Sequence, residues 1–190
     1  MALGTNDVDN LLIGSNGAVF SAPYGTALPT SEVSSVSLYD PVGYITPAGP
    51  QIDTKVTTKD IMSWQSFFPT LTRAVSLDGT VKFGVQEFTA ETMGLAFGGG
   101  TLAEPTAGHY TFEPADPSEI EERTLIIDVH DGDDILRIVV ERCFNVGGFS
   151  TSFTRENEAV LPIELKILKG DTYAQGVKFF TNIASFAAAS

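Results

Sequence analysis

The strongest constraint on the fold is an alternation of apolar and polar residues over positions 75–86. Successive side chains of a β-strand point to opposite faces, so this alternation predicts a strand with one buried face. Gly79 and Gly84 occupy one position on each face. The apolar face contains Val75, Leu77, Val81, Phe83 and Val85, and the polar face contains Ser76, Asp78, Thr80, Lys82 and Gln86.

Other segments extend this pattern into an all-β fold. The sequence predicts a second alternating strand at 161–167 and a hairpin at 125–140 that turns at Asp131-Gly132. Shorter strands are expected at 17–23, 43–46, 51–58 and 176–181, and one short helix at 89–97, capped by Thr89 and ended by Gly98. Short strands separated by Gly and Pro turns indicate two packed antiparallel sheets, arranged as a sandwich or barrel.

The chain length fits one domain, which we place at 17–182. Residues 1–16 are predicted to form an extended arm with one apolar trio, Leu11, Leu12 and Ile13. Residues 183–190 are predicted to form a flexible tail. An extended loop is expected at about 55–72, between two strands of the domain.

That loop contains an unusual apolar run where a turn would ordinarily place Gly, Asn or Asp. Loops lie on surfaces because their backbone needs water, so such a run must bury itself against its own domain or against a neighbouring subunit. The residues alone leave both possibilities open. The run comprises Ile61, Met62, Trp64, Phe67 and Phe68, and includes the only Trp of the chain.

The net charge of −13 argues against a protein that grips nucleic acid by neutralising phosphates. Such an acidic balance fits plain solubility, or a surface that repels polyanions. We expect no membrane span, because no run of about 18 apolar residues occurs. No secretory signal is expected in the first residues either.

Residues with catalytic or metal-binding chemistry are sparse. His109 and His130 lack ligand-spaced partners, and the acidic run after His130 fits a hairpin turn better than a calcium loop. Cys143, the only cysteine, has no evident partner that would activate it. We therefore expect no enzyme activity, no catalytic residues, no metal and no cofactor.

Three stretches together resemble the major tail proteins, or tail tube proteins, of long-tailed siphophages, especially those of actinobacterial hosts. The first runs from Gly17 to Thr30. The second runs from Gly43 to Thr46 and continues from Thr57 to Gln65. The third is the late strand from Val160 to Lys166.

This resemblance implies a virion protein that is assembled in the host cytoplasm as hexameric rings stacked into a hollow tube. The loop after the second stretch and the N-terminal arm would reach adjacent subunits. Other tail proteins (the tape measure, terminator and distal tail proteins) would be its partners, and DNA would pass through the lumen. The net charge of −13 suggests in addition that this lumen is acidic and that DNA passes without specific binding. No membrane and no small-molecule substrate are implied.

Candidate positions for these roles come from the strand faces and the apolar run. The expected subunit and ring contacts are Ile61, Met62, Trp64, Phe67, Phe68, Leu11, Leu12 and Ile13. The expected lumen positions are Ser76, Asp78, Thr80, Lys82, Asp128 and Glu164. For any one of the latter, an ordinary solvent-exposed strand face is an equal alternative.

Two other classes of protein remain as alternatives. The first is another particle component with a similar fold, such as a tail terminator, a head–tail connector or a decoration protein. The second is a carbohydrate- or receptor-binding β-sandwich, which would present exposed aromatic residues beside polar hydrogen-bonding groups.

Overall fold

The computed structural model describes residues 11–183 and confirms an all-β fold with one short helix. The strands and the helix in chain order are β1 (Asn16–Pro23), β2 (Asp40–Pro41), β3 (Gln51–Ile61), β4 (Leu71–Val85), α1 (Ala90–Phe97), β5 (Gly100–Thr106), β6 (His109–Pro114), β7 (Arg123–Asp131), β8 (Asp134–Asn145), β9 (Leu161–Ile167) and β10 (Val177–Thr181).

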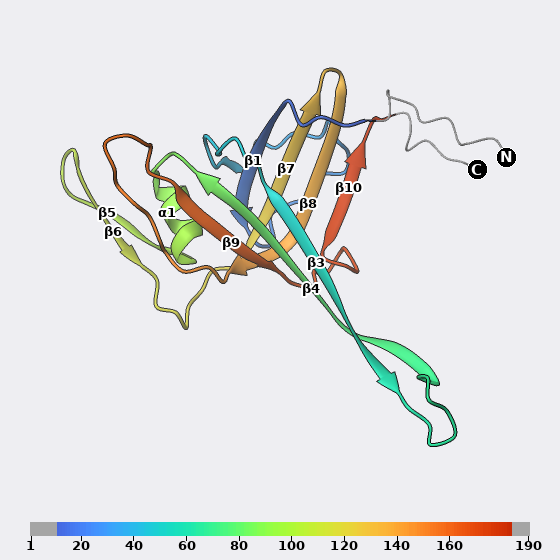
Figure 1. Ribbon diagram of the computed structural model, residues 1–190. Helices are drawn as coiled ribbons and strands as arrows, with labels where there is room; N and C mark the ends of the chain where they lie inside the picture. Colours follow the sequence, from blue (N-terminus) through green and yellow to red (C-terminus); the bar gives the residue numbers. More distant parts are fainter. Residues whose placement is uncertain (1–10, 184–190) are drawn as a thin grey trace.

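Eight of the strands form one antiparallel sheet in the order β2-β1-β7-β8-β9-β4-β3, and β10 pairs with β8 beside this path. Strands β5 and β6 form a separate two-stranded sheet. The large sheet bends where β8 passes from β7 to β9, so that β9, β4 and β3 cross over β1, β7 and β8 (Figure 1). The result is a sandwich of two layers made from one continuous sheet.

The main core lies between these two layers. One layer contributes Val81 and Phe83 of β4 and Ile163 of β9, and the other contributes Leu125 and Ile127 of β7. Helix α1 adds Leu95 and Ala96 to the same cluster. The inward side chains are every second residue of β4 and β9, as the alternation predicts.

A second, smaller core covers the other face of β7 and β8. Ile126 and Val139 point to that face, where Tyr39 and the partly buried Leu28 and Val36 cover them. These covering residues come from the long connection between β1 and β2.

The capping residues and the turn sequence predicted helix α1 and the β7–β8 hairpin correctly. Thr89 caps α1 through a bond from the Thr92 amide, and Gly98 ends it with a left-handed φ of 74°. Strands β7 and β8 are joined by a tight turn in which Gly132 has a φ of 62°.

The prediction of a strand at 43–46 was wrong, because only Ile45 makes an isolated bridge, to Val85. The hairpin of β5 and β6 was missed. Of its side chains only that of Phe112 is partly buried, so its sequence carries no alternation.

Strands β3 and β4 continue well past the body of the molecule as a projecting hairpin (Figure 1). Half of the segment predicted as a loop at 55–72 is therefore paired strand, and the other half, 62–70, is loop. Val75 and Leu77 follow the apolar pattern of the buried face but are exposed, because no other layer covers this part of β4. At the other end of the chain, Ile183 is buried, and residues 184–190 lie outside the described part.

Candidate functional site

The apolar run that stood out in the sequence forms the tip of the β3–β4 hairpin. Its aromatic side chains are almost wholly exposed, with Trp64 at 99%, Phe67 at 101% and Phe68 at 80%. Ile61 and Met62 are exposed as well. Within one copy of the chain, these side chains are free to contact another molecule.

The loop holds its shape through its own polar groups. The Thr70 amide donates to the Ile61 carbonyl at 2.8 Å, which closes the hairpin. The hydroxyl of Ser63 donates to the Gln65 side chain at 2.6 Å, and that of Ser66 donates to the Phe68 carbonyl at 2.9 Å. The polar side chains thus bond inside the loop, and the apolar ones are left on its outside.

The stem beneath the tip is exposed on both faces. Val56 lies opposite Leu77, and both are about half exposed. The pairing shifts by one residue between Thr57 and Thr58, which leaves Val75 as an extra residue in β4. Such a bulge bends a hairpin and increases its twist, so it sets the direction of the tip relative to the body.

The polar face of β4 continues across both neighbouring strands. Lys82 lies opposite Gln51 of β3 and Glu164 of β9, and Thr80 lies opposite Asp53 and Lys166. Residues paired in this way share one face of a sheet. The structure therefore brings together five of the predicted lumen residues: Ser76, Asp78, Thr80, Lys82 and Glu164.

The charges on this face are balanced. Lys82 Nζ lies 3.1 Å from Glu164 Oε1, and Lys166 Nζ lies 3.5 Å from Asp78 Oδ1. Asp53 and Lys55 extend the same face along β3. Three acidic and three basic residues thus share a surface that the sequence had suggested would be acidic.

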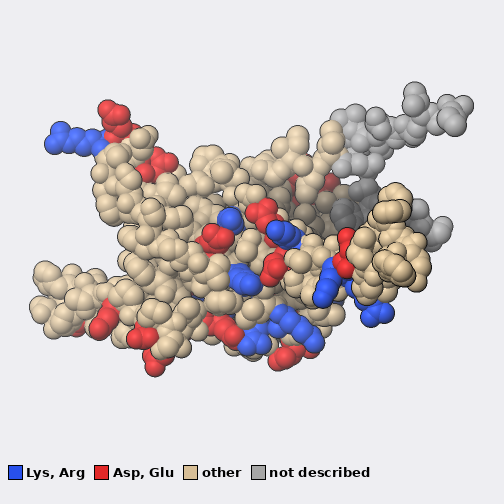
Figure 2. Space-filling view, turned by 60° about the horizontal axis from the view of Figure 1, so that its bottom comes forward, with Lys and Arg blue, Asp and Glu red and all other residues tan. Residues whose placement is uncertain are grey.

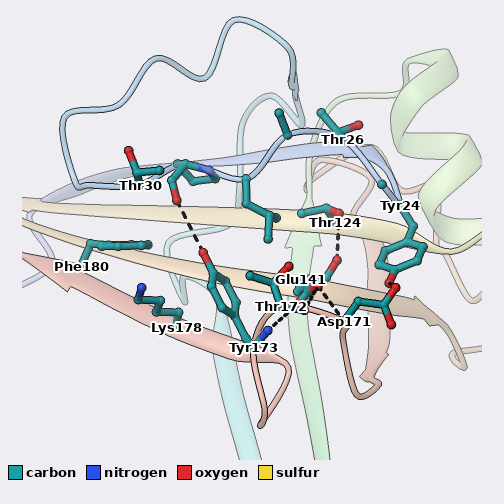
Figure 3. Close-up of a pocket in the computed structure, with 14 residues that line it drawn as sticks. Tyr24, Thr26, Thr30, Thr124, Glu141, Asp171, Thr172, Tyr173, Lys178 and Phe180 are labelled. Atoms are coloured by element: carbon teal, nitrogen blue, oxygen red, sulfur yellow. Dashed lines mark hydrogen bonds between the residues drawn. The ribbon is translucent and has the colours of Figure 1, made fainter.

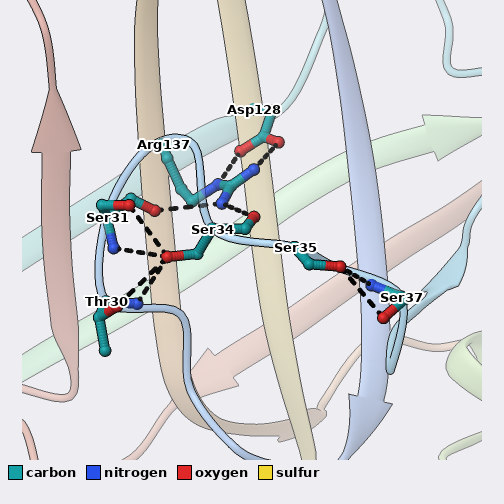
Figure 4. A network of polar contacts seen from close by, with 7 residues as sticks. All are labelled: Thr30, Ser31, Ser34, Ser35, Ser37, Asp128 and Arg137. Atoms are coloured by element: carbon teal, nitrogen blue, oxygen red, sulfur yellow. Dashed lines mark hydrogen bonds and ion pairs between the residues drawn. The ribbon is translucent and has the colours of Figure 1, made fainter.

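Asp128 does not belong to this face. It is buried, and both of its carboxylate oxygens bind the guanidinium of Arg137 at 2.7 Å (Figure 4). It points into the second core, on the side of β7 that faces the connection between β1 and β2. The sequence analysis expected Asp128 on an exposed polar face of its strand, but the connection between β1 and β2 covers that face.

Leu11, Leu12 and Ile13 are exposed and lie beside the turn between β7 and β8. The Ile13 amide donates to Asp131 Oδ2 at 2.7 Å, and the Ser15 hydroxyl donates to the His130 carbonyl at 3.0 Å. These contacts hold the start of the described chain away from the hairpin tip (Figure 1).

A family profile described as "Phage tail tube protein" matches residues 4–189. This chain belongs to the phage tail tube protein family. A search of curated proteins found no match. Membership of this family assigns the chain a structural role in the phage tail. The exposed tip of the β3–β4 hairpin agrees with that role, because a structural subunit needs surfaces for assembly.

In this tail tube protein, a polar recess between the β1–β2 connection and the loop before β10 is occupied by the protein's own backbone. Glu141 lies in a cavity of about 490 Å³, where it accepts hydrogen bonds from the amides of Asp171, Thr172 and Tyr173 at 2.6–2.8 Å (Figure 3). Burial raises the pKa of Glu141, but these donors outweigh it and hold the pKa below its usual range. The carboxylate is a structural anchor for the loop before β10.

Other reactive groups lie apart from one another. Cys143 is fully buried, and burial raises the pKa of its thiol to about 12, against a smaller lowering by Arg123. Within residues 11–183, no three His, Cys, Asp or Glu side chains gather as they would to hold a metal ion. No helix in that range is long and apolar enough to cross a membrane.

Proposed function

We propose that copies of this protein form hexameric rings that stack into the hollow tube of the phage tail, and that DNA passes through this tube into the host. The observation that carries the proposal is the exposed apolar tip on a projecting hairpin. Burying a large apolar side chain stabilises a contact by about 1.5–3 kcal/mol. A tip with Trp64, Phe67 and Phe68 therefore supplies strong anchors for a neighbouring copy.

The exposed edge of β3 supports a second contact within a ring. Among the described strands, β3 pairs with β4 alone, so its other edge keeps backbone groups available. A free edge of this length promotes pairing with another chain, and closure into a barrel of several copies removes it. The exposed Leu11, Leu12 and Ile13 would add a further contact from the arm.

The shared face of β3, β4 and β9 is our candidate for the lumen. Its three acidic residues equal its three basic residues in number, and two of each are paired, so we propose a lumen of balanced charge rather than an acidic one. Phosphate binding requires free cations. A lumen in which Lys82 and Lys166 are already paired would let DNA pass without adhering.

We propose further that the protein is assembled in the host cytoplasm and meets the tape measure, terminator and distal tail proteins in the virion. It would need no cofactor, no membrane and no small-molecule substrate. Its work would be mechanical, and no catalysis is assigned to it.

The test is to concentrate the purified protein and image it by negative-stain electron microscopy. Long tubes of uniform diameter are expected. Isolated rings or monomers at all concentrations would contradict the proposal and favour a terminator, connector or decoration protein.

Variants of Trp64 connect that outcome to the tip. Trp64→Ala is expected to abolish tubes while the melting temperature stays unchanged, because the side chain makes no buried contact within the protomer. Trp64→Phe is the matched control and should retain tubes, since it keeps an apolar ring. Normal tubes from Trp64→Ala, or loss of its fold, would contradict the role given to the tip.

A further inference from the structure

A second exposed apolar surface lies at the end of the molecule opposite the hairpin tip. Its centre is Phe97 of α1, whose ring stacks on Phe149 at 4.8 Å between centroids and contacts Phe112 of β6 at 6.0 Å. Phe88 and Phe153 form another ring pair at 6.0 Å. We call the set Phe88, Phe97, Phe112, Phe149 and Phe153 the aromatic end surface.

These five residues come from three segments: residues 88–97, strand β6 and the connection between β8 and β9. Several of their side chains are exposed. Phe153 is 76% exposed, and Phe88 and Phe149 are nearly half exposed. Leu102 of β5, which lies opposite Phe112, is half exposed too. Exposed aromatic clusters of this kind mark contact surfaces.

The segments beside the aromatic end surface are mainly acidic, with exposed Arg155, two residues after Phe153, as an exception. The segment 98–122 contains six acidic residues and neither Lys nor Arg. Glu121 and Glu122 pair with Arg123 and Arg142. The other four, Glu104, Glu113, Asp116 and Glu119, are exposed and form no ion pair with any described residue.

The hairpin near the tip has the opposite charge. Lys55, Lys59 and Arg73 are exposed, and none forms an ion pair within residues 11–183. Asp60, the one acidic residue between positions 54 and 77, accepts a bond from the Thr72 hydroxyl at 2.6 Å. In Figure 2 acidic side chains predominate over the end where β5 and β6 lie, where one Lys or Arg side chain also projects, and most Lys and Arg side chains lie over the middle and towards the hairpin, mixed with acidic ones.

One detail of the hairpin indicates a partner of negative charge. Lys59 and Arg73 are directly opposite each other in the β3–β4 ladder. Like charges in that position destabilise a strand pair. Within one copy nothing in the described chain relieves this repulsion, whereas acidic groups from another molecule would.

We infer that the hairpin tip of one copy docks on the aromatic end surface of a copy in the adjacent ring. Met62, Trp64, Phe67 and Phe68 would pack on its rings, while Lys59 and Arg73 would face the acidic residues beside it. This inference rests on the proposed function and names the partner surface for the tip. Because the two surfaces differ and lie at opposite ends, the contact does not close and generates a filament of defined direction.

Charge reversal at each end tests the pairing. The tip variant is Lys59→Glu with Arg73→Glu, and the end variant is Glu113→Lys with Glu119→Lys. The side chains of Glu113 and Glu119 make no hydrogen bond with described residues, so these changes leave the fold intact. Each variant alone is expected to need a protein concentration about tenfold higher than wild type to form tubes.

Assembly of an equimolar mixture of the two variants is the decisive experiment. The acidic tip of one variant matches the basic end of the other, and the unchanged basic tip matches the unchanged acidic end. The mixture is therefore expected to form tubes at close to the wild-type concentration. Lys169→Glu, an exposed charge change outside both surfaces, serves as the control and should assemble normally.

The outcomes separate this inference from the proposed function. If wild type forms tubes and Trp64→Ala does not, but both charge variants assemble normally or the mixture fails to recover, the inference is wrong and the tube role stands. If wild-type protein forms no tubes, the proposed function itself fails. Circular dichroism and the melting temperature of each variant confirm that loss of tubes is not loss of fold.

Discussion

The guanidinium of Arg137 holds the carboxylate of Asp128 through two parallel hydrogen bonds of 2.7 Å, Nε to Oδ1 and Nη2 to Oδ2. The remaining nitrogen, Nη1, donates to the carbonyl oxygens of Ser31 and Ser34 (Figure 4). A single buried ion pair thus joins β7 and β8 to the connection that covers the second core.

Removing the negative partner should destabilise the fold strongly. Asp128→Ala leaves Arg137 buried without a counter-charge, and we expect a loss of about 3–5 kcal/mol in the free energy of unfolding. Chemical denaturation of dilute protein measures it, and hydrogen exchange should show faster exchange in the segment around Ser31 and Ser34. The control is Glu164→Gln, which breaks an exposed pair and should cost below about 1 kcal/mol. Equal losses of unfolding free energy in the two variants would contradict this role of the Asp128–Arg137 ion pair.

Glu141 should make stability depend on pH in the acid range. Its pKa in the folded protein is lowered, so the stabilisation is complete above the ordinary value of about 4.3 and is lost as pH falls through the folded-state pKa. Denaturation curves across the acid range should show this loss in wild type. Glu141→Gln should be less stable at neutral pH, because its side-chain nitrogen cannot accept the amide bonds, and its pH dependence should be flatter. A Glu119→Gln control should follow wild type; if Glu141→Gln does so as well, the anchor role is wrong.

Cys143 should resist thiol reagents in the folded protein. The thiol is buried and its pKa is raised to about 12, so at pH 8 its thiolate is rarer than that of a free cysteine by about a thousandfold. Labelling with a chromogenic disulfide reagent should be slower by at least about that factor than in denaturant. Because Cys143 is the only cysteine, the signal reports one site. Rapid labelling of folded protein would show that this part of β8 opens.

The balanced face of β3, β4 and β9 predicts how a charge change would alter contact with DNA. Asp78→Lys combined with Glu164→Lys adds cations and frees Lys166 and Lys82 from their partners. If this face lines the lumen, short duplex DNA should co-sediment with the variant tubes, less so as salt rises, and DNA release from particles should slow. Asp40→Lys, on exposed β2, is the control. Unchanged release and no DNA retention would remove this face from the lumen.

Predictions from sequence succeeded where the signal was local. The alternation in β4 and β9, the Asp131-Gly132 turn and the cap at Thr89 each depend on neighbouring residues, and the structure confirms all of them. The hairpin of β5 and β6 escaped detection because its strands bury almost no side chain. Asp128 was misplaced because its sequence neighbours cannot reveal a covering segment from about a hundred positions away.

The sequence by itself determined that this chain is mainly β, where most strands lie, and that the run from Ile61 to Phe68 must be buried against its own domain or against another subunit, because periodicity and side-chain chemistry are local properties. Only the tertiary structure decided that this run stands free at the tip of a hairpin and that the charges beside β4 are balanced. It alone placed an acidic aromatic surface at the opposite end of the molecule. These facts depend on which distant segments lie together, and that is fixed by packing between layers rather than by any stretch of sequence.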